Sequence, residues 1–454
     1  MASTYLSRTP SSASNRRTWT WSAWVKRTGT YAGGAEQYQY LWDADNGASQ
    51  SESKIGFISD TLHYNIWNGS SNDAEVITNA KYRDTNAWYH IVIAFDTTQA
   101  TASDRIKFYV NGVQETSFST TQYPSQNYEG GINNDCPHSI GRWTDGNGRY
   151  FDGIMSHIHF CDGQTYQASD FGQYDANGVW TIKTSPSVTY GTNGFFILKD
   201  GNSVTDQSGN SNNFTVGGGT LTNTEDNPSN VFATVNSLFN PDPSNPLSSI
   251  SNGNLSFTTN STSDTSMGVT TFGASSGKWY AEIKSTGESG TGEAFAGIGY
   301  DIYENATTSM NSDSSFMWNV CSNGDAKFGG SGQGIGNWSN TYTTNDIISI
   351  ALDLDNNRVY FAKNGQYADG SGNWNQAFTG SPAYATITAD KTYFFCAGDK
   401  SGSQTASWSC NFGNGYFGTT AVSSAGTNAS GNGIFEYDVP TGYTAFCTKG
   451  LNGE

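Results

Sequence analysis

Two stretches of alternating hydrophobic and polar positions share one design and organise the chain. Ile348, Ile350 and Leu352 occupy every second position of a segment that ends at a polar turn, which is the period of a half-buried strand. A second strand over residues 358–363 follows and closes with Asn-Gly, a pair suited to the positive φ angles of a tight hairpin turn. Residues 90–112 repeat this order, and a Trp-containing strand precedes each copy. The pattern predicts two β-sandwich domains in tandem.

The composition suits short strands joined by many turns. The 454 residues include 53 Gly, 14% aromatic residues and 14% charged residues, and we find no long amphipathic helical segment. At about 150 residues per domain, this length allows two large domains or three small ones. We expect a first sandwich over residues 1–200, in which residues 161–200 are partly a packing extension. A connector rich in Pro, Asn and Ser over residues 201–250 then leads to a second sandwich over residues 251–454.

Aromatic residues within the strand patterns are the expected core. Trp19 and Trp21 lie two positions apart, so their side chains point to one face of their strand. The same reasoning assigns Trp88, Trp279 and Phe361 to the core of their respective domains.

The charge balance narrows the classes of partner. Asp and Glu total 40 against 22 Lys and Arg, which gives a net charge of −18. A field of that sign repels phosphate backbones, so we expect no nucleic-acid partner and no adsorption to anionic membranes. We also expect no membrane insertion, because no apolar run is long enough to span a bilayer. The first residues lack the apolar segment of a secretory signal, which predicts synthesis in the cytoplasm without export by that route.

The six cysteines form no Cys-x-x-Cys pair, so the sequence contains no metal or redox motif of that kind. Scattered cysteines in apolar company are most often buried free thiols. We therefore predict free thiols, while a disulfide between two of the cysteines stays open.

Several motifs carry a resemblance to known folds. Residues 87–91, 106–112 and 151–160 contain a Trp-x-His strand, a Phe-Tyr-Val-Asn-Gly hairpin and a late Phe-Asp-Gly strand, and in this order they resemble laminin-G-like domains. Residues 345–348 and 353–365 resemble the signatures of SPRY domains. Both families are concanavalin A-like jelly rolls. The resemblance implies an all-β chain with a laminin-G-like sandwich followed by a SPRY-like sandwich.

A further resemblance suggests the biological setting. Residues 5–13, 206–214 and 435–447 are similar to segments of tail-fibre and virion surface proteins of marine bacteriophages. The resemblance implies a protein at the surface of a virion, as a tail fibre or a capsid fibre or knob. It also implies other virion proteins as partners and a homo-oligomer, for which a trimer is the usual form.

Tryptophans beside Asn, Asp and Gly in predicted loops are candidate binding residues. Their ring faces can stack on sugar rings while neighbouring amides and carboxylates bond the hydroxyl groups. The candidates are Trp42, Trp67, Asn68, Trp143, Trp318, Trp338 and Trp374. The alternative interpretation is that these rings fill the ends of the sandwiches or a contact between subunits.

Two short patterns have a residue spacing that is compatible with a metal site. Asp43, Asp45 and Asn46 resemble an acidic loop with which laminin-G-like domains hold Ca²⁺ through oxygen ligands, although the full ligand set is missing. His157 and His159 have a spacing that places two imidazoles on one strand face. No Cys or carboxylate pattern accompanies the two histidines, so we expect them to form a polar outer face.

Catalysis is not predicted. Glycoside hydrolases of concanavalin-like fold need paired carboxylates on one strand, with the two groups about 5 Å apart for a retaining mechanism. The nearest pattern here, Glu436 and Asp438, lacks the third acidic residue of that motif. Glu288 and Glu293 lie in a Gly- and Ser-rich loop and are expected to be solvated.

The sequence therefore predicts a bacteriophage virion structural protein that recognises a host surface glycan and is not an enzyme. Three alternatives stay open: a glycan-active enzyme of concanavalin-like fold, a purely structural capsid decoration protein, and a bacterial surface adhesin.

Overall fold

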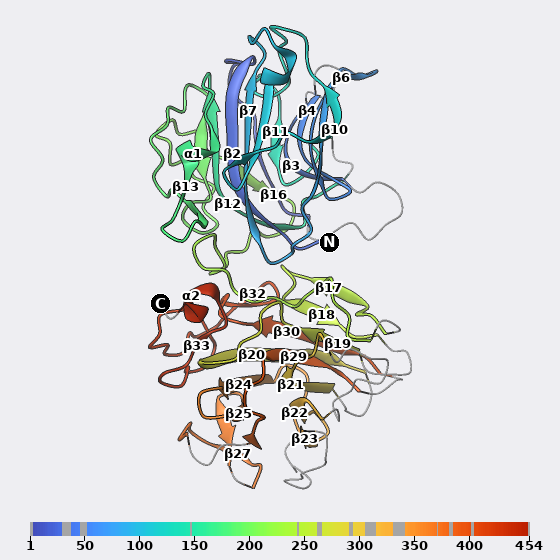
Figure 1. Cartoon of the computed structure of the whole chain (residues 1–454), viewed down its shortest axis with the longest axis vertical. Helices are drawn as coiled ribbons and strands as arrows, with labels where there is room; N and C mark the ends of the chain where they lie inside the picture. The colour runs from blue at the N-terminus through green and yellow to red at the C-terminus, as the bar shows by residue number, and fades with distance from the viewer. Residues whose placement is uncertain are drawn as a thin grey trace. The chain divides into compact units, whose positions relative to one another are not determined.

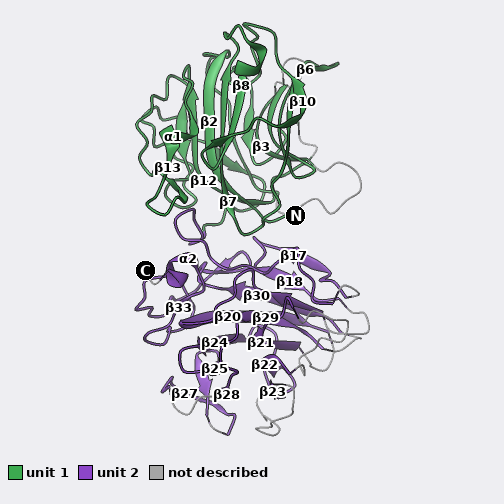
Figure 2. Ribbon diagram, viewed as in Figure 1, with its two compact units in different colours: residues 1–223 green, residues 224–454 purple. Residues whose placement is uncertain are grey.

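The chain forms two compact units, residues 1–223 and 224–454 (Figure 2). The computed structural model describes residues 3–29, 38–45, 52–145, 148–242, 245–260, 266–289, 294–304, 315–329, 341–369, 371–380, 385–400 and 404–452. In those ranges the helices are short turns, α1 (Ala168–Phe171), α2 (Thr448–Leu451) and the 3₁₀ turn η1 (Ala102–Asp104). Each unit is built from packed antiparallel sheets (Figure 1).

The first unit has two main sheets. Sheet 1 has the order β10 (Phe118–Gln122), β6 (Asn72–Lys81), β5 (Thr61–Trp67), β4 (Glu52–Ile58), β3 (Tyr38–Ala44), β11 (His138–Ile140), β1 (Tyr5–Arg8) and β16 (Thr215–Gly217). Sheet 2 has the order β15 (Phe195–Ile197), β12 (Gly153–Asp162), β2 (Thr18–Arg27), β7 (Trp88–Asp96), β8 (Ile106–Val110) and β9 (Val113–Gln114).

Aromatic side chains fill the space between these sheets. Trp19 and Trp21 of β2 are fully buried, as predicted, and the Trp19 ring stacks on Phe95 with centroids 4.8 Å apart. Trp42 of β3 lies with its ring centroid 4.8 Å from that of Phe160 on β12. The prediction that Trp42 lies in a loop is wrong, because β3 continues to Ala44 and places this ring in the core at 1% exposure.

Residues 163–190 cover the outer face of sheet 2. The hairpin of β13 (Gly172–Tyr174) and β14 (Trp180–Ile182) carries Trp180, which donates its indole N–H to His90 Nδ1 at 3.1 Å. His157 has a positive φ of 49° at a bulge in β12, and His159 is 2% exposed beneath Phe196 and Tyr190. The expected polar face around His157 and His159 is wrong for His159, because the extension shields this ring from solvent.

The predicted connector divides between the two units. β16, within residues 215–217, pairs with β1 of the first unit. Further along, Phe232 forms a bridge with Cys447, and Val235 forms one with Thr270, so both belong to the second unit. In the described ranges, backbone pairing therefore continues on both sides of residue 223.

The second unit also has two main sheets. Sheet 3 has the order β17 (Ser249–Ser251), β18 (Ser256–Thr258), β30 (Ala406–Asn411), β20 (Lys278–Glu288), β24 (Ile347–Asp353), β25 (Arg358–Lys363), β26 (Gln366–Ala368) and β27 (Trp374–Gln376), with β28 (Ala385–Thr386) beside β25 and β33 (Thr444–Ala445) beside β20. Sheet 4 has the order β19 (Ser266–Val269), β29 (Tyr393–Asp399), β21 (Ala294–Tyr300), β22 (Met317–Cys321) and β23 (Ala326–Phe328). A separate small hairpin pairs β31 (Tyr416–Phe417) with β32 (Thr420–Ala421).

The hairpin predicted from alternation is confirmed in sheet 3. Ile350 pairs with Phe361 across β24 and β25, and both side chains are fully buried. Trp279 is also buried, at 3% exposure. The loop prediction for Trp318 is wrong, because this residue lies in β22 at 4% exposure and donates its indole N–H to the Thr386 carbonyl.

All six cysteines are buried free thiols, which confirms that prediction. Among the described residues, no helix has the length and apolar character needed to cross a bilayer.

Replacing Trp42 by Ala should lower the free energy of unfolding by about 3–5 kcal/mol, because the cavity left between the sheets cannot close fully. Urea unfolding of the full chain, followed by tryptophan fluorescence, measures this loss. Val113→Ala is the control, since Val113 is 60% exposed and its change should stay within about 0.5 kcal/mol. Equal effects for the two variants would contradict the assignment of Trp42 to the core.

Candidate binding surface on sheet 1

The outer faces of the four main sheets differ in what covers them. Apolar clusters lie on the outer faces of sheets 2, 3 and 4, where other segments of the same unit pack against them. Tyr280 and Tyr360 on sheet 3, for example, share a cluster with Phe435 and Val439 from near the C-terminus. In the part of the chain that the structure describes, the outer face of sheet 1 carries no such cluster. This face is therefore the candidate binding surface.

Strand register aligns polar residues across the whole of sheet 1. The Cα partners run in the order Thr215, Ser7, Ser139, Asp43, Lys54, Asn65, Glu75 and Gln122, and we call them the polar row. Their neighbours in sequence, such as Trp42, Ile55 and Tyr64, are core residues. Because side chains alternate along a strand, the polar row faces away from the core.

The segment after β11 packs over the middle of this row. The Thr144 main-chain N–H donates to Asp43 Oδ2 at 2.6 Å. The Lys54 ammonium lies 4.5 Å from the centroid of the Trp143 ring and also pairs with Glu52. As a result Asp43 is fully buried and Lys54 is 6% exposed, while the residues at both ends of the row stay accessible.

Beside the row lies a group of stacked rings and guanidinium ions that we call the aromatic–arginine cluster: Tyr5, Tyr38, Arg142, Trp143 and Arg149. The Arg142 guanidinium carbon is 3.4 Å from the centroid of the Tyr5 ring. That of Arg149 lies 4.6 Å from the Tyr38 ring and 4.4 Å from the Trp143 ring. Distances of this size are within the range of cation–π attraction, which restrains the two guanidinium groups beside the rings.

Several polar atoms near the row have no hydrogen-bond partner within the described residues. They are Asp43 Oδ1, Ser139 Oγ, Arg142 Nε and Trp143 Nε1. Buried polar groups are normally paired, with protein or with ordered water, because leaving one unpaired costs about 1–3 kcal/mol. The indole N–H groups of Trp19, Trp21 and Trp42 in the core also lack a partner within the described residues, so unpaired atoms do not by themselves distinguish the outer face of sheet 1.

Asp43 has an altered acidity at this position. Burial raises the pKa of its carboxyl group to about 7, and the Thr144 hydrogen bonds and the Lys54 charge oppose that rise. The carboxyl group therefore gains its proton more readily in the folded chain than in the unfolded chain.

The predicted binding residues are only partly brought together. Trp67 ends β5 half-buried, and its Cα partner on β4 is Glu52, so it lies on the same face as Trp143. Asn68 is used by its own turn, where its Oδ1 accepts the N–H groups of Ser70 and Ser71. Trp374 is half-buried in β27 of the second unit, and Trp338 lies outside the described residues. Trp42 and Trp318 are core residues.

The residues behind the calcium prediction offer few free oxygens. Asp43 Oδ2 already accepts the Thr144 N–H, Asp45 is 3% exposed, and Asn46 lies outside the described residues. Ca²⁺ takes six to eight oxygen ligands, and no cluster of three or more His, Cys, Asp or Glu suited to a metal occurs in the described ranges. Asp43 and Asp45 therefore do not fit a Ca²⁺ site.

The acidic residues considered for catalysis hold loops in place. Glu436 accepts the Ser423 N–H at 2.8 Å, and Asp438 accepts the Thr427 N–H at 2.7 Å. Glu288 accepts the Ser322 hydroxyl at 2.7 Å, and Glu293 lies outside the described residues.

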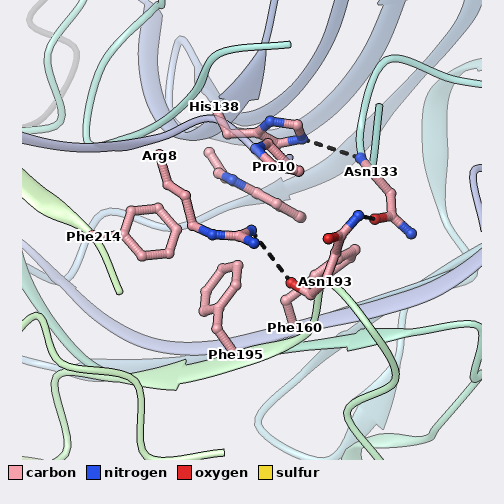
Figure 3. A pocket seen from close by; sticks show the side chains of 9 residues that line it. Arg8, Pro10, Asn133, His138, Phe160, Asn193, Phe195 and Phe214 are labelled. Carbon is pink, nitrogen blue, oxygen red and sulfur yellow. Dashed lines mark hydrogen bonds between the residues drawn. The ribbon is translucent and has the colours of Figure 1, made fainter. Parts of the chain in front are cut away.

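A small cavity at the end of the first sandwich is too small for a sugar (Figure 3). It is lined by Arg8, Pro10, Trp42, Asn133, His138, Phe160, Asn193, Phe195 and Phe214. The space open to the centre of a water molecule is about 10 Å³, which is near the minimum for one water. His138 Nε2 accepts the Asn133 N–H and burial lowers the His138 pKa to about 4, so the ring is a neutral structural group.

The strand order defines an all-β protein built from concanavalin-like sandwiches, as predicted. Residues 2–168 match the family model of the concanavalin A-like lectin/glucanases superfamily, in its laminin-G form. No curated protein sequence matches the chain.

Two solved structures give loose overlays. The SPRY domain of human HERC1 has 18% identity and a TM-score of 0.27, over 34% of this chain and 87% of that one. A heptameric SAP-like pentraxin from Limulus polyphemus has 15% identity and a TM-score of 0.29, over 48% of this chain and 90% of that one. Because these identities and TM-scores are low, the fold assignment rests on the strand order and the family match.

Asp43→Asn should change how stability depends on pH. Since folding raises this pKa, the wild-type carboxyl group contributes stability at low pH that is lost as pH rises from about 4 to about 7. The Asn variant cannot ionise, so relative to the wild type it should gain on the order of 1–4 kcal/mol between pH 4 and pH 8. Urea unfolding of both proteins at several pH values measures the difference, and parallel profiles would contradict the assigned pKa.

Proposed function

We propose that this chain is a bacteriophage virion surface protein that binds a host glycan through the outer face of sheet 1. The observation that carries the proposal is the polar row with the aromatic–arginine cluster beside it. Trp67 supplies a ring face, the Trp143 ring holds Arg149 beside the row, and the row supplies hydroxyl, amide and carboxylate groups for sugar hydroxyls.

The shape of the surface suits an extended ligand. Eight strands at about 4.8 Å spacing place the ends of the polar row about 33 Å apart. The segment after β11 covers the middle of the row, so a linear saccharide would contact the accessible strands on either side of that segment. The ends of the row, Thr215 and Gln122, are exposed, so the ligand has access from both sides.

Hydrolysis is less well supported than binding. Retaining glycosidases need one carboxyl group as nucleophile and one as acid, both facing the sugar. Glu436 and Asp438 are engaged by main-chain N–H groups of a neighbouring loop, in the unit without the polar row. Glu282 accepts the Glu436 and Tyr437 N–H groups and is fully buried.

The virion setting rests on the sequence resemblance of residues 5–13, 206–214 and 435–447 to phage fibre and surface proteins. The net charge of −18 would keep such a protein soluble at a particle surface. Oligomerisation, for which a trimer is the form expected from the resemblance, would multiply weak contacts with a repetitive cell surface.

Trp143→Ala should weaken glycan binding roughly three- to tenfold, because the ring that holds the Arg149 guanidinium beside the row is lost. A glycan array probed with the full chain identifies the ligand, and titration calorimetry with that ligand measures the change. Trp374→Ala is the matched control, as it removes a half-buried tryptophan from the second unit. Equal affinity for the wild type and Trp143→Ala would place the site elsewhere.

Purified phage particles labelled with a gold-conjugated antibody against this chain should show label on the surface. Label at the tail would favour a receptor-binding fibre, and label over the capsid would favour a fibre or decoration protein there. Particles without label would contradict the virion assignment and would favour an adhesin or an enzyme instead.

A further inference from the structure

We infer that the saccharide bound at sheet 1 carries an acidic group, a carboxylate or a sulfate, that is recognised by Arg142 and Arg149. This inference rests on the proposed function and specifies its ligand. It follows from the local charge and from the ring contacts that restrain the two guanidinium groups.

The local charge differs from that of the chain as a whole. Acidic residues exceed basic ones by 40 to 22 over the full sequence. At the aromatic–arginine cluster, however, two arginines lie close to Trp143, one on each side of it in the sequence. In the described residues neither guanidinium lies within ion-pair distance of a carboxylate, whereas Arg16, Arg17, Arg27 and Arg83 each do.

The carboxylates near the cluster leave this positive charge largely uncompensated. Glu52 is paired with Lys54, and Asp43 is buried beneath the Thr144 N–H. Asp145 is exposed in the same segment and is the nearest acidic residue in sequence. The two arginines therefore outnumber the one exposed carboxylate of this segment.

Ring contacts restrain the two guanidinium groups. The guanidinium carbons lie over Tyr5, Tyr38 and Trp143, and Arg149 is exposed while Arg142 is half-buried, so a ligand can reach part of their N–H edges. Those edges match two oxygens of a carboxylate or sulfate at once, and a pre-oriented group loses little entropy on binding. Arg142 Nε is buried and the Arg149 side chain also donates to the Tyr40 hydroxyl, so the remaining N–H groups are the ones that a ligand would meet.

A sugar with isolated acidic groups fits better than a dense polyanion. The net charge of −18 repels a ligand with one phosphate per residue over its whole length. A short acidic saccharide interacts electrostatically mainly with the nearby arginines, because charges farther away than about 8 Å are screened at physiological salt.

The test compares three short saccharides of similar length with the full chain by calorimetry: a dextran fragment with a single uronic acid residue, a dextran fragment with a single sulfate group, and neutral dextran. We expect binding of one acidic saccharide and at least tenfold weaker binding of dextran. Arg149→Gln and Arg142→Gln should each weaken acidic-saccharide binding roughly 10- to 100-fold. Arg17→Gln is the matched control, because it removes an exposed arginine that pairs with Glu129 and should change affinity less than twofold.

Arg149→Lys separates charge from geometry. It keeps the positive charge but loses the bidentate edge, so its affinity should fall between those of the wild type and Arg149→Gln. Thermal melts of all variants confirm folding. Binding of dextran equal to that of the acidic saccharides would overturn this inference and leave glycan binding intact. Binding of none of the three, together with an array that detects no glycan, would overturn the proposed function as well.

Discussion

Burial of Trp42 against Phe160 is the contact on which the surface of sheet 1 depends. A strand exposes alternate residues on opposite faces, and a slip of one position would exchange all of them. With Trp42 fixed in the core, Asp43 must point outward, and the pairing of β3 with β4 and β11 then sets Lys54 and Ser139 beside it. The aromatic core thus determines which polar groups meet on the opposite face, although none of the core residues touches that face.

This arrangement lowers the stability of the fold, and apolar burial elsewhere in the same unit offsets that loss. A buried carboxyl group, a buried ammonium group and several unpaired donors on one face are unfavourable compared with an apolar cover. The stacked pairs Trp19–Phe95 and Trp21–Trp42 between the sheets supply large apolar burial in the same unit. A polar surface maintained against such a cost is typical of sites that bind ligands, where local rules of packing give way to recognition.

The sequence predicted the architecture better than the surface. Alternation and the Asn-Gly turns predicted the hairpin of β24 and β25 and the core positions of Trp19 and Trp279. Polar neighbours suggested loops at Trp42 and Trp318, but both strands run further than that local signal indicates. The aromatic–arginine cluster joins residues near positions 5, 38 and 142–149, and their meeting depends on strand order and register, which one sequence does not display. Only Trp143 could be selected, through its polar neighbours.

The outer face of sheet 1 differs from the other three outer faces in the size of the segment that covers it. Sheet 2 is covered by the hairpin that carries Trp180, and a Cβ added to Gly112 or Gly172 would lie within 2.5 Å of that indole ring, so this cover is closely fitted. Sheet 3 is covered by residues 435–447, which Glu282 anchors through two main-chain N–H groups. Covers of this kind bury apolar clusters and make those faces part of the interior. The cover on sheet 1 is a short segment held by Trp143, Arg149 and one hydrogen bond to Asp43. Sheets 2, 3 and 4 thus bury apolar clusters beneath segments of their own unit, whereas the described part of sheet 1 presents charged side chains in contact with aromatic rings, which is why the proposed binding site is assigned to this face.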